Sequence, residues 1–288
     1  MIIIGMSNSV KLAKSIAKHA GKTFSELNSK HFPDGESNLR FMKSVKGKHV
    51  VLVNSFYPNP NNTLTELYFA TRSAKNQGAK KVTIIAPYLG YMRQDKDFHQ
   101  GEIVSSIYMG ELMSCADELI TIDPHLHRYK TLNQVIKTKT KRLSANSLIA
   151  EYIKKNHPNA IIIGPDSESY QWAEHIAEKL HHHAVVLRKK RYSSTTVRIK
   201  LKQDVKWNGK NVVIVDDIIS TGHTMIEPIK QLKTKGVKNI YCIGVHGIFV
   251  LDAIEKLEKL GAKVICTNTI ERKQSKIDVA NLIVENIK

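Results

Sequence analysis

The chain contains two similar strand–helix–strand segments, one in each half. Residues 46–53 and 208–215 both carry a Gly-Lys pair followed by a run of apolar, mostly β-branched residues. A helical pattern follows each run, and a Gly-x-Lys sequence then leads into a second apolar run, near 82 and near 240. This pattern predicts two βαβ units with parallel strands and right-handed crossovers. Any two βαβ units look alike, but the shared glycine and lysine positions favour duplication of one domain.

Duplication predicts an α/β protein of two tandem domains, each a mainly parallel sheet flanked by helices. We place these domains at residues 1–142 and 143–288, because a basic stretch at 139–142 precedes a helix that Ser144 can cap. The last helical pattern, at 277–287, either stays with the second domain or returns to pack on the first. The sequence leaves both arrangements open.

The net charge of +18 allows two classes of partner, nucleic acids and small polyanions. The basic residues are spread along the chain without a helix-turn-helix signature, zinc-finger spacing or aromatic RNA-binding platform, so we expect no nucleic acid. The longest apolar runs are strand-sized, so we expect no membrane span. Residues 1–5 lack the basic start and small-residue cleavage site that a signal peptide would have, so we expect none. Cys115, Cys242 and Cys266 stand far apart among apolar neighbours. We therefore expect reduced core cysteines in a cytoplasmic protein.

The segment 212–224 contains the clearest candidate site. A β-branched run ends in Asp216 and Asp217, and a short loop with Ser220, Thr221 and Gly222 leads into a helical pattern. Ligands bind beyond the carboxyl ends of parallel strands, where loop and helix N–H groups hold anions. The carboxylates can accept hydrogen bonds from sugar hydroxyls or hold a divalent cation. Together these parts predict a sugar-phosphate site, whereas the first half has Asn54 and Ser55 at the matching place.

Five further polar segments have both a structural and a functional interpretation. The stretch 31–36 is either an ordinary Pro-Asp-Gly turn or a purine-binding turn with a stacking ring and acceptor carboxylates. The stretches 87–96, 123–127 and 166–169 follow apolar strands, where a solvated loop, a phosphate contact or a magnesium site would all fit. The basic stretch 188–191 is a nucleic-acid patch, a solvated hairpin or a loop that closes over a transferring phosphoryl group.

In their order along the chain, these segments resemble the ribose-phosphate pyrophosphokinase family, and most closely its archaeal members. The resemblance is carried by the stretches 32–36, 93–96, 123–125 and 215–224. It implies two tandem phosphoribosyltransferase-like domains and Mg²⁺-dependent transfer of the β,γ-pyrophosphoryl group of ATP to ribose 5-phosphate. It also implies a homo-oligomer of at least two subunits, because adenine would be bound partly by a neighbouring subunit.

The resemblance also assigns roles to individual residues. The residues implied for ATP binding are Phe32, Asp34, Gly35, Glu36, Arg93, Gln94, Asp95, Lys96 and His125. Those implied for ribose 5-phosphate are Arg191, Asp216, Asp217, Ser220, Thr221, Gly222, His223 and Thr224. Lys189 and Arg191 match the catalytic Lys-x-Arg pair of a flexible loop, and His125 and Asp166, with Asp123 as a weaker candidate, match magnesium ligands.

Two departures from the family pattern and two alternative functions accompany this resemblance. His223 stands where many members have glycine, which is costly if that backbone position needs a positive φ. The turn 167–169 is bulkier and more acidic than usual.

A phosphoribosyltransferase would not need the stretches 32–36 and 93–96, and a catalytically silent regulatory homologue would be expected to lose the Lys-x-Arg or the acidic pair.

Overall fold

The computed structural model describes residues 1–166, 169–180, 184–186, 188–191, 197–200 and 205–287, with the backbone alone for 170, 171, 184, 186, 188–191 and 197–200. The chain divides into two compact units. The first comprises Met1–Ser144, Thr269–Glu271 and the chain from Val279 on, and the second comprises Ala145–Asn268 and Arg272–Asp278. The chain therefore crosses between the units more than once.

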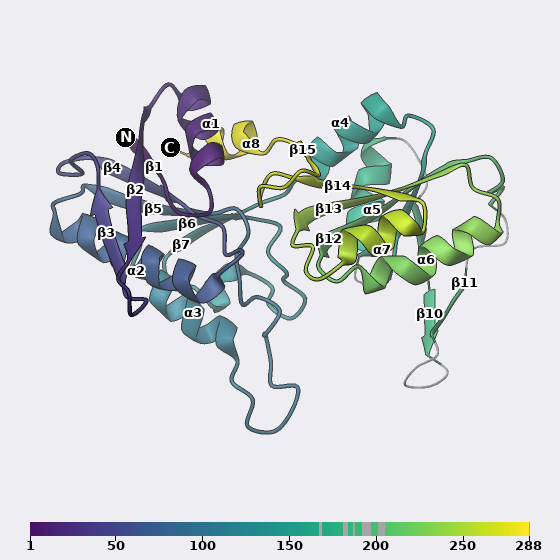
Figure 1. Ribbon diagram of the computed structural model, residues 1–288, viewed down its shortest axis with the longest axis horizontal. Coiled ribbons are helices and arrows are strands. Elements are labelled where there is room, and N and C mark those ends of the chain that lie inside the picture. The colour runs from purple at the N-terminus through teal and green to yellow at the C-terminus, as the bar shows by residue number, and fades with distance from the viewer. Residues whose placement is uncertain (167–168, 181–183, 187, 192–196, 201–204, 288) are drawn as a thin grey trace. The chain divides into compact units, whose positions relative to one another are not determined.

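The first unit is a seven-stranded sheet with helices packed on it (Figure 1). The strands are β1 (Ile2–Gly5), β2 (Thr23–His31), β3 (Ser37–Phe41), β4 (His49–Val53), β5 (Lys81–Ala86), β6 (Glu118–Ile122) and β7 (Lys139–Leu143). The helices are α1 (Val10–Ala20), α2 (Pro60–Asn76), α3 (Ser105–Met113), the 3₁₀ turn η1 (Leu132–Gln134) and α8 (Ala280–Val284). The strand order is β3-β2-β1-β4-β5-β6-β7, and only the β2–β3 pair is antiparallel.

The second unit is a six-stranded parallel sheet with a separate two-stranded ribbon. The strands of the sheet are β8 (Ile161–Gly164), β9 (Ala184–Val186), β12 (Asn211–Ile219), β13 (Asn239–Gly247), β14 (Ala262–Thr267) and β15 (Ser275–Ile277). The ribbon consists of β10 (Arg188–Arg191) and β11 (Val197–Lys200). The helices are α4 (Asn146–Asn156), α5 (Tyr170–Lys179), α6 (His223–Thr234) and α7 (Ala253–Lys259). The strand order is β15-β14-β13-β12-β8-β9. The predicted α/β class with two mainly parallel sheets is confirmed.

The two sheets have the same strand order, which supports duplication. Reading β2-β1-β4-β5-β6-β7 against β9-β8-β12-β13-β14-β15 pairs each strand with its counterpart. The hydrogen bonds of the repeated glycine and lysine positions also match. The Gly47 N–H donates to the Gly78 carbonyl at 2.7 Å, and the Gly209 N–H donates to the Gly236 carbonyl at 2.9 Å. All four glycines have a positive φ, so the glycines that the repeat shares are those that the backbone requires.

The strands form as buried parallel strands do, from continuous β-branched runs. In β4, Val50, Val51, Leu52 and Val53 have no exposed surface, and Val212–Ile214 in β12 are equally buried. The carboxyl ends of these strands carry the polar residues singled out from the sequence. At the end of the chain, α8 lies beside α1 and packs against it (Figure 1). The last helix therefore belongs to the first unit.

The three cysteines are free thiols, and Cys242 and Cys266 are buried, as expected of core cysteines. Burial raises the pKa of the Cys242 thiol to about 12, so this thiol stays protonated and unreactive at neutral pH. Within the described ranges, the helices are all too short or too polar to cross a membrane.

Candidate functional site

The acidic pair of the second unit lies inside β12 rather than after it. The strand continues to Ile219, and Asp216 and Ile218 still pair with β13. Asp216 and Asp217 are both buried, and the Asp217 carboxylate accepts the N–H of Ile218 at 2.7 Å. Because the strand positions both carboxylates, they stay next to the loop that follows.

Ser169 joins Asp216 to Asp166. Its hydroxyl oxygen lies 2.7 Å from Asp166 Oδ1 and 2.8 Å from Asp216 Oδ1. One hydroxyl hydrogen satisfies only one of these acceptors, so the other contact needs a proton on a carboxyl group or a nearby cation. Burial, and after it the charge of Asp217, raises the pKa of Asp216 well above its ordinary value. The sequence analysis included Ser169 in the stretch 166–169 but assigned it no role of its own.

The loop 220–224 leads into α6, and small residues followed by the N–H groups of a helix start are an arrangement that can hold an anion. Gly222 precedes the helix with φ of 76°, and His223 is the first helical residue. The left-handed position is therefore occupied by a glycine, and the expected strain at His223 does not arise. His223 Nδ1 lies 2.8 Å from Thr221 Oγ1, and the Thr224 hydroxyl donates to Asp216 Oδ2 at 3.3 Å.

The predicted Lys-x-Arg pair lies in the two-stranded ribbon. Lys189 pairs with Ile199 and Arg191 with Val197 in the antiparallel β10–β11 ladder. Only the backbone of this pair belongs to the described part of the chain, and Ser167 and Glu168 of the acidic turn lie outside it.

In the first unit, the predicted adenine-binding segment is the turn between β2 and β3. The Phe32 N–H donates to the Glu36 carbonyl, and the Gly35 N–H to the Phe32 carbonyl, both at 2.9 Å. Asp34 accepts the N–H of Glu36 at 3.1 Å. Gly35 has φ of 93°, and the Phe32 side chain is 50% exposed. A ring fixed on a tight hairpin turn and open to solvent is available for stacking on a base.

The loops after β5 and β6 are joined by an ion pair between a buried aspartate and a partly exposed arginine. Arg128 donates to both carboxylate oxygens of Asp95, at 2.7 and 3.0 Å, and the Asp95 side chain is 1% exposed. Arg93 and Lys96 on either side of Asp95 are exposed. Asp95 therefore holds Arg128, while the exposed side chains of Arg93 and Lys96 are open to an anionic ligand. The sequence prediction missed Arg128, because an ion pair between two loops has no local spacing signature.

The loop after β6 carries two histidines in contact. His127 Nε2 lies 3.0 Å from His125 Nδ1, and the ring planes are nearly perpendicular. Asp123 is buried and has a positive φ of 35°. The non-glycine residues with positive φ in the described ranges are Tyr91, Asp123, Phe249 and Leu251, all in loops that follow β5, β6 or β13. Backbone strain of this kind concentrates at functional sites, and here it occurs at the carboxyl ends of the strands.

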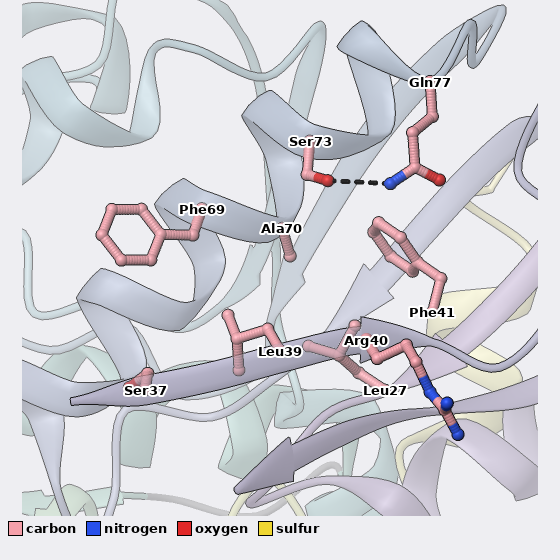
Figure 2. Close-up of a pocket in the computed structure, with 9 residues that line it drawn as sticks. All are labelled: Leu27, Ser37, Leu39, Arg40, Phe41, Phe69, Ala70, Ser73 and Gln77. Atoms are coloured by element: carbon pink, nitrogen blue, oxygen red, sulfur yellow. Dashed lines mark hydrogen bonds between the residues drawn. The ribbon is translucent and has the colours of Figure 1, made fainter. Parts of the chain in front are cut away.

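A pocket of about 410 Å³ lies elsewhere in the first unit, between α2 and the β2–β3 pair. Figure 2 shows its mixed lining of apolar and polar side chains and the hydrogen bond that Gln77 donates to Ser73. The lining residues are Leu27, Ser37, Leu39, Arg40, Phe41, Phe69, Ala70, Ser73 and Gln77. None of the predicted site residues lines this pocket, so it is separate from the polar strand ends.

Comparisons with known proteins match both units. Residues 1–116 match the N-terminal domain of ribose phosphate pyrophosphokinase, and residues 134–280 match the phosphoribosyl transferase domain. The ribose-phosphate pyrophosphokinase of Sulfolobus acidocaldarius is 33% identical over 98% of this chain and 97% of its own length. That of Pyrococcus abyssi is 35% identical over 99% and 97%. A crystal structure of phosphoribosylpyrophosphate synthetase from Mycobacterium smegmatis superposes with a TM-score of 0.86 at 25% identity, covering 99% of this chain and 97% of that one.

Proposed function

The chain belongs to the ribose-phosphate pyrophosphokinase family, and on that premise we propose that it transfers the β,γ-pyrophosphoryl group of ATP to the C1 hydroxyl of ribose 5-phosphate. The products are 5-phosphoribosyl 1-diphosphate and AMP. The observation that carries this proposal is the buried Asp216–Asp217 pair beside the N-terminal loop of α6. The carboxylates can accept hydrogen bonds from sugar hydroxyls, and the nearby N–H groups can bind phosphate. These two kinds of group match the two ends of ribose 5-phosphate.

The acceptor sugar is oriented by its two ends. In this proposal, Ser220, Thr221, Gly222, His223 and Thr224 bind the 5-phosphate, and Asp216 and Asp217 accept hydrogen bonds from the ribose hydroxyls. Two fixed ends leave the C1 hydroxyl in one orientation, which is the main requirement for a transfer reaction that depends on alignment. Lys189 and Arg191 neutralise the charge that develops on the transferred group.

The donor set of the second unit suits Mg²⁺, the ion that the family implies. Asp166 and Asp216 share one hydroxyl donor, and Asp217 adds to the repulsion that raises the pKa of Asp216. A hard divalent cation bound by carboxylate oxygen relieves such crowding. We assign Asp166 as its ligand in the second unit, and His125, with Asp123 as the weaker candidate, in the first. When bound, the ion neutralises charge on the phosphate oxygens.

The residues of the first unit bind ATP in this proposal. Phe32 stacks on adenine, and Asp34 and Glu36 beside Gly35 accept its amino hydrogens. Arg93, Gln94 and Lys96 contact the phosphates, together with His125. Asp95 acts through Arg128, which supports the loop that carries the exposed cations. Three reduced thiols are also consistent with a cytoplasmic location, which is part of the same proposal.

A single assay tests this function. Purified protein with ATP, Mg²⁺ and ribose 5-phosphate should form AMP and 5-phosphoribosyl 1-diphosphate in equal amounts, and AMP formation should require ribose 5-phosphate. Consumption of 5-phosphoribosyl 1-diphosphate with a free base would indicate a phosphoribosyltransferase instead. Nucleotide binding without turnover would indicate a regulatory homologue.

The family also implies an oligomer, and the first unit has an apolar surface suited to it. Five apolar side chains on α3 and the loop before it are between 39% and 67% exposed: Phe98, Ile103, Ile107, Tyr108 and Leu112. Lys96 and Arg128 lie over the Phe98 ring, and Glu102 accepts the N–H of Phe98, so two copies of this surface can pair opposite charges. We propose that a second copy of the chain covers it.

The double variant Ile107→Glu/Leu112→Glu should therefore reduce the molar mass measured by light scattering to that of one chain, because buried charges oppose the contact. The double variant Lys154→Glu/Lys155→Glu, on exposed positions of α4, is the matched control. A wild-type protein that is already monomeric, or a variant of unchanged mass, contradicts this assignment of the surface.

A further inference from the structure

A second loop holds the loop proposed to bind the sugar phosphate. The N–H groups of Ile248 and Phe249 both donate to the carbonyl of Ile219, at 3.0 and 3.1 Å. The Val250 N–H donates to the carbonyl of Ser220 at 3.2 Å. These two carbonyls belong to the last residue of β12 and the first residue of the loop 220–224. The position of the anion-binding loop therefore depends on the backbone of residues 248–250.

This second loop has an unfavourable backbone conformation. Phe249 has φ of 48° and Leu251 has φ of 56°, in the left-handed region that side chains disfavour. The Leu251 side chain is 85% exposed, so its own packing does not compensate for this conformation. Such a conformation persists only where the surrounding structure imposes it. The contacts that impose this backbone conformation therefore also help to position the loop 220–224.

Two contacts anchor the loop at its base. The ring of Phe249 packs in the core of the second unit against Gly247 and Cys266, where a Cβ on Gly247 would overlap both. Arg272, from the segment between β14 and β15, donates from Nε to the Gly247 carbonyl at 3.2 Å and from Nη2 to the Ile248 carbonyl at 2.6 Å. A guanidinium group fixes two adjacent carbonyls at once, whereas an ammonium group is a single point charge.

We propose that Arg272 is a positioning residue for ribose 5-phosphate binding. By fixing the carbonyls of Gly247 and Ile248, it orients the N–H groups of residues 248–250 that hold the carbonyls of Ile219 and Ser220. Those two residues in turn present the loop 220–224 to the 5-phosphate. This inference rests on the proposed function, because the ligand of the loop is assigned there. In this proposal Arg272 acts through the backbone of residues 247–250 rather than through a contact of its own with the substrate.

The kinetic test compares Arg272→Ala, Arg272→Lys and the wild-type protein at full length, with Lys276→Ala as the control from an exposed position nearby. Arg272→Ala should raise the KM for ribose 5-phosphate about tenfold, because small displacements of a binding loop are costly. The KM for ATP should change less than about twofold. Arg272→Lys should fall between the alanine variant and wild type, and it also serves if the alanine variant does not fold. An equal rise of both KM values would overturn the positioning role.

A second measurement is independent of activity. Hydrogen exchange on the free protein should show the amides of residues 248–250 exchanging about tenfold faster in Arg272→Ala, because their protection depends on a fixed loop. The amides of Val50–Val53 in the first unit should be unaffected. Unchanged exchange at 248–250 would refute the role of Arg272 even if the wild-type enzyme is active. Failure of the wild-type protein to form AMP would instead refute the proposed function, while the exchange result would still decide the structural role.

Discussion

Replacing Lys189 by alanine should lower turnover about 10³-fold and leave the KM for ribose 5-phosphate within about twofold of wild type. The reason is that pyrophosphoryl transfer places additional negative charge on the oxygens of the transferred group, and a cation that meets this charge acts mainly in the transition state. In the proposed function the acceptor sugar is held elsewhere, by the loop 220–224 before and at the start of α6 and by the acidic pair of β12. Steady-state kinetics with ribose 5-phosphate as the varied substrate measures both quantities.

The neighbouring lysine provides the matched control. Positions 189 and 191 fall on one face of the extended strand β10 and position 190 on the other, because a strand alternates with a period of two. Lys190→Ala removes the same charge from the same strand, but from its other face. It should reduce turnover less than about fivefold, because it weakens only the long-range electrostatic attraction of anionic substrates. Equal losses in the two variants would show that net charge, and not a positioned cation, is responsible. Near-wild-type turnover of Lys189→Ala would exclude the catalytic role.

The repeated segments show how much of the fold was predictable from the sequence. Parallel pairing within each half followed from apolar runs and from glycines whose positive φ the structure confirms at Gly47, Gly78, Gly209 and Gly236. These features are local, and each half repeats them. The hairpin ribbon β10–β11 and the return of α8 to the first unit were not predictable in the same way, because they depend on contacts that a local pattern does not specify.

The candidate site was predictable at its motifs but not at the residues that support them. Asp216, Asp217 and Gly222 stand in one short segment, so their proximity needed no tertiary information. Arg128 meets Asp95 across two loops, and Arg272 meets the carbonyls of Gly247 and Ile248 from another strand connection. Such supporting contacts join segments whose separation varies with loop length, so no spacing rule detects them. His223 shows the converse, since its expected strain disappeared once the left-handed position proved to be Gly222.

Replacing Asp216 by asparagine should separate the function of this residue from its effect on stability. The side-chain amide of the Asp216→Asn variant would keep an oxygen to accept hydrogen bonds from Ser169 and from the Asp217 N–H, which Asp216 accepts at 2.8 and 3.0 Å. It would lose the negative charge that, in the proposed function, accepts a hydrogen bond from a sugar hydroxyl. A hydrogen bond to a charged group contributes about 1.5–3 kcal/mol, so kcat/KM for ribose 5-phosphate should fall about 10- to 150-fold.

The same substitution should make the folded protein more stable. Burial and the charge of Asp217 raise the pKa of Asp216, which means that the ionised carboxylate destabilises the folded state at neutral pH. This destabilisation is absent below the ordinary pKa of an aspartate, grows as the pH rises above it, and levels off above the raised pKa of the folded state. A neutral amide removes it, and the melting temperature at pH 7 should rise by about 2–4 °C, the shift that ~1 kcal/mol produces. Asp252→Asn, at an exposed ion pair with Lys256, should change neither activity nor melting temperature measurably. If the Asp216→Asn variant lost both activity and stability, Asp216 would have a structural role and not a substrate-binding one. The sugar-binding role of the pair would then have to be assigned to Asp217 alone.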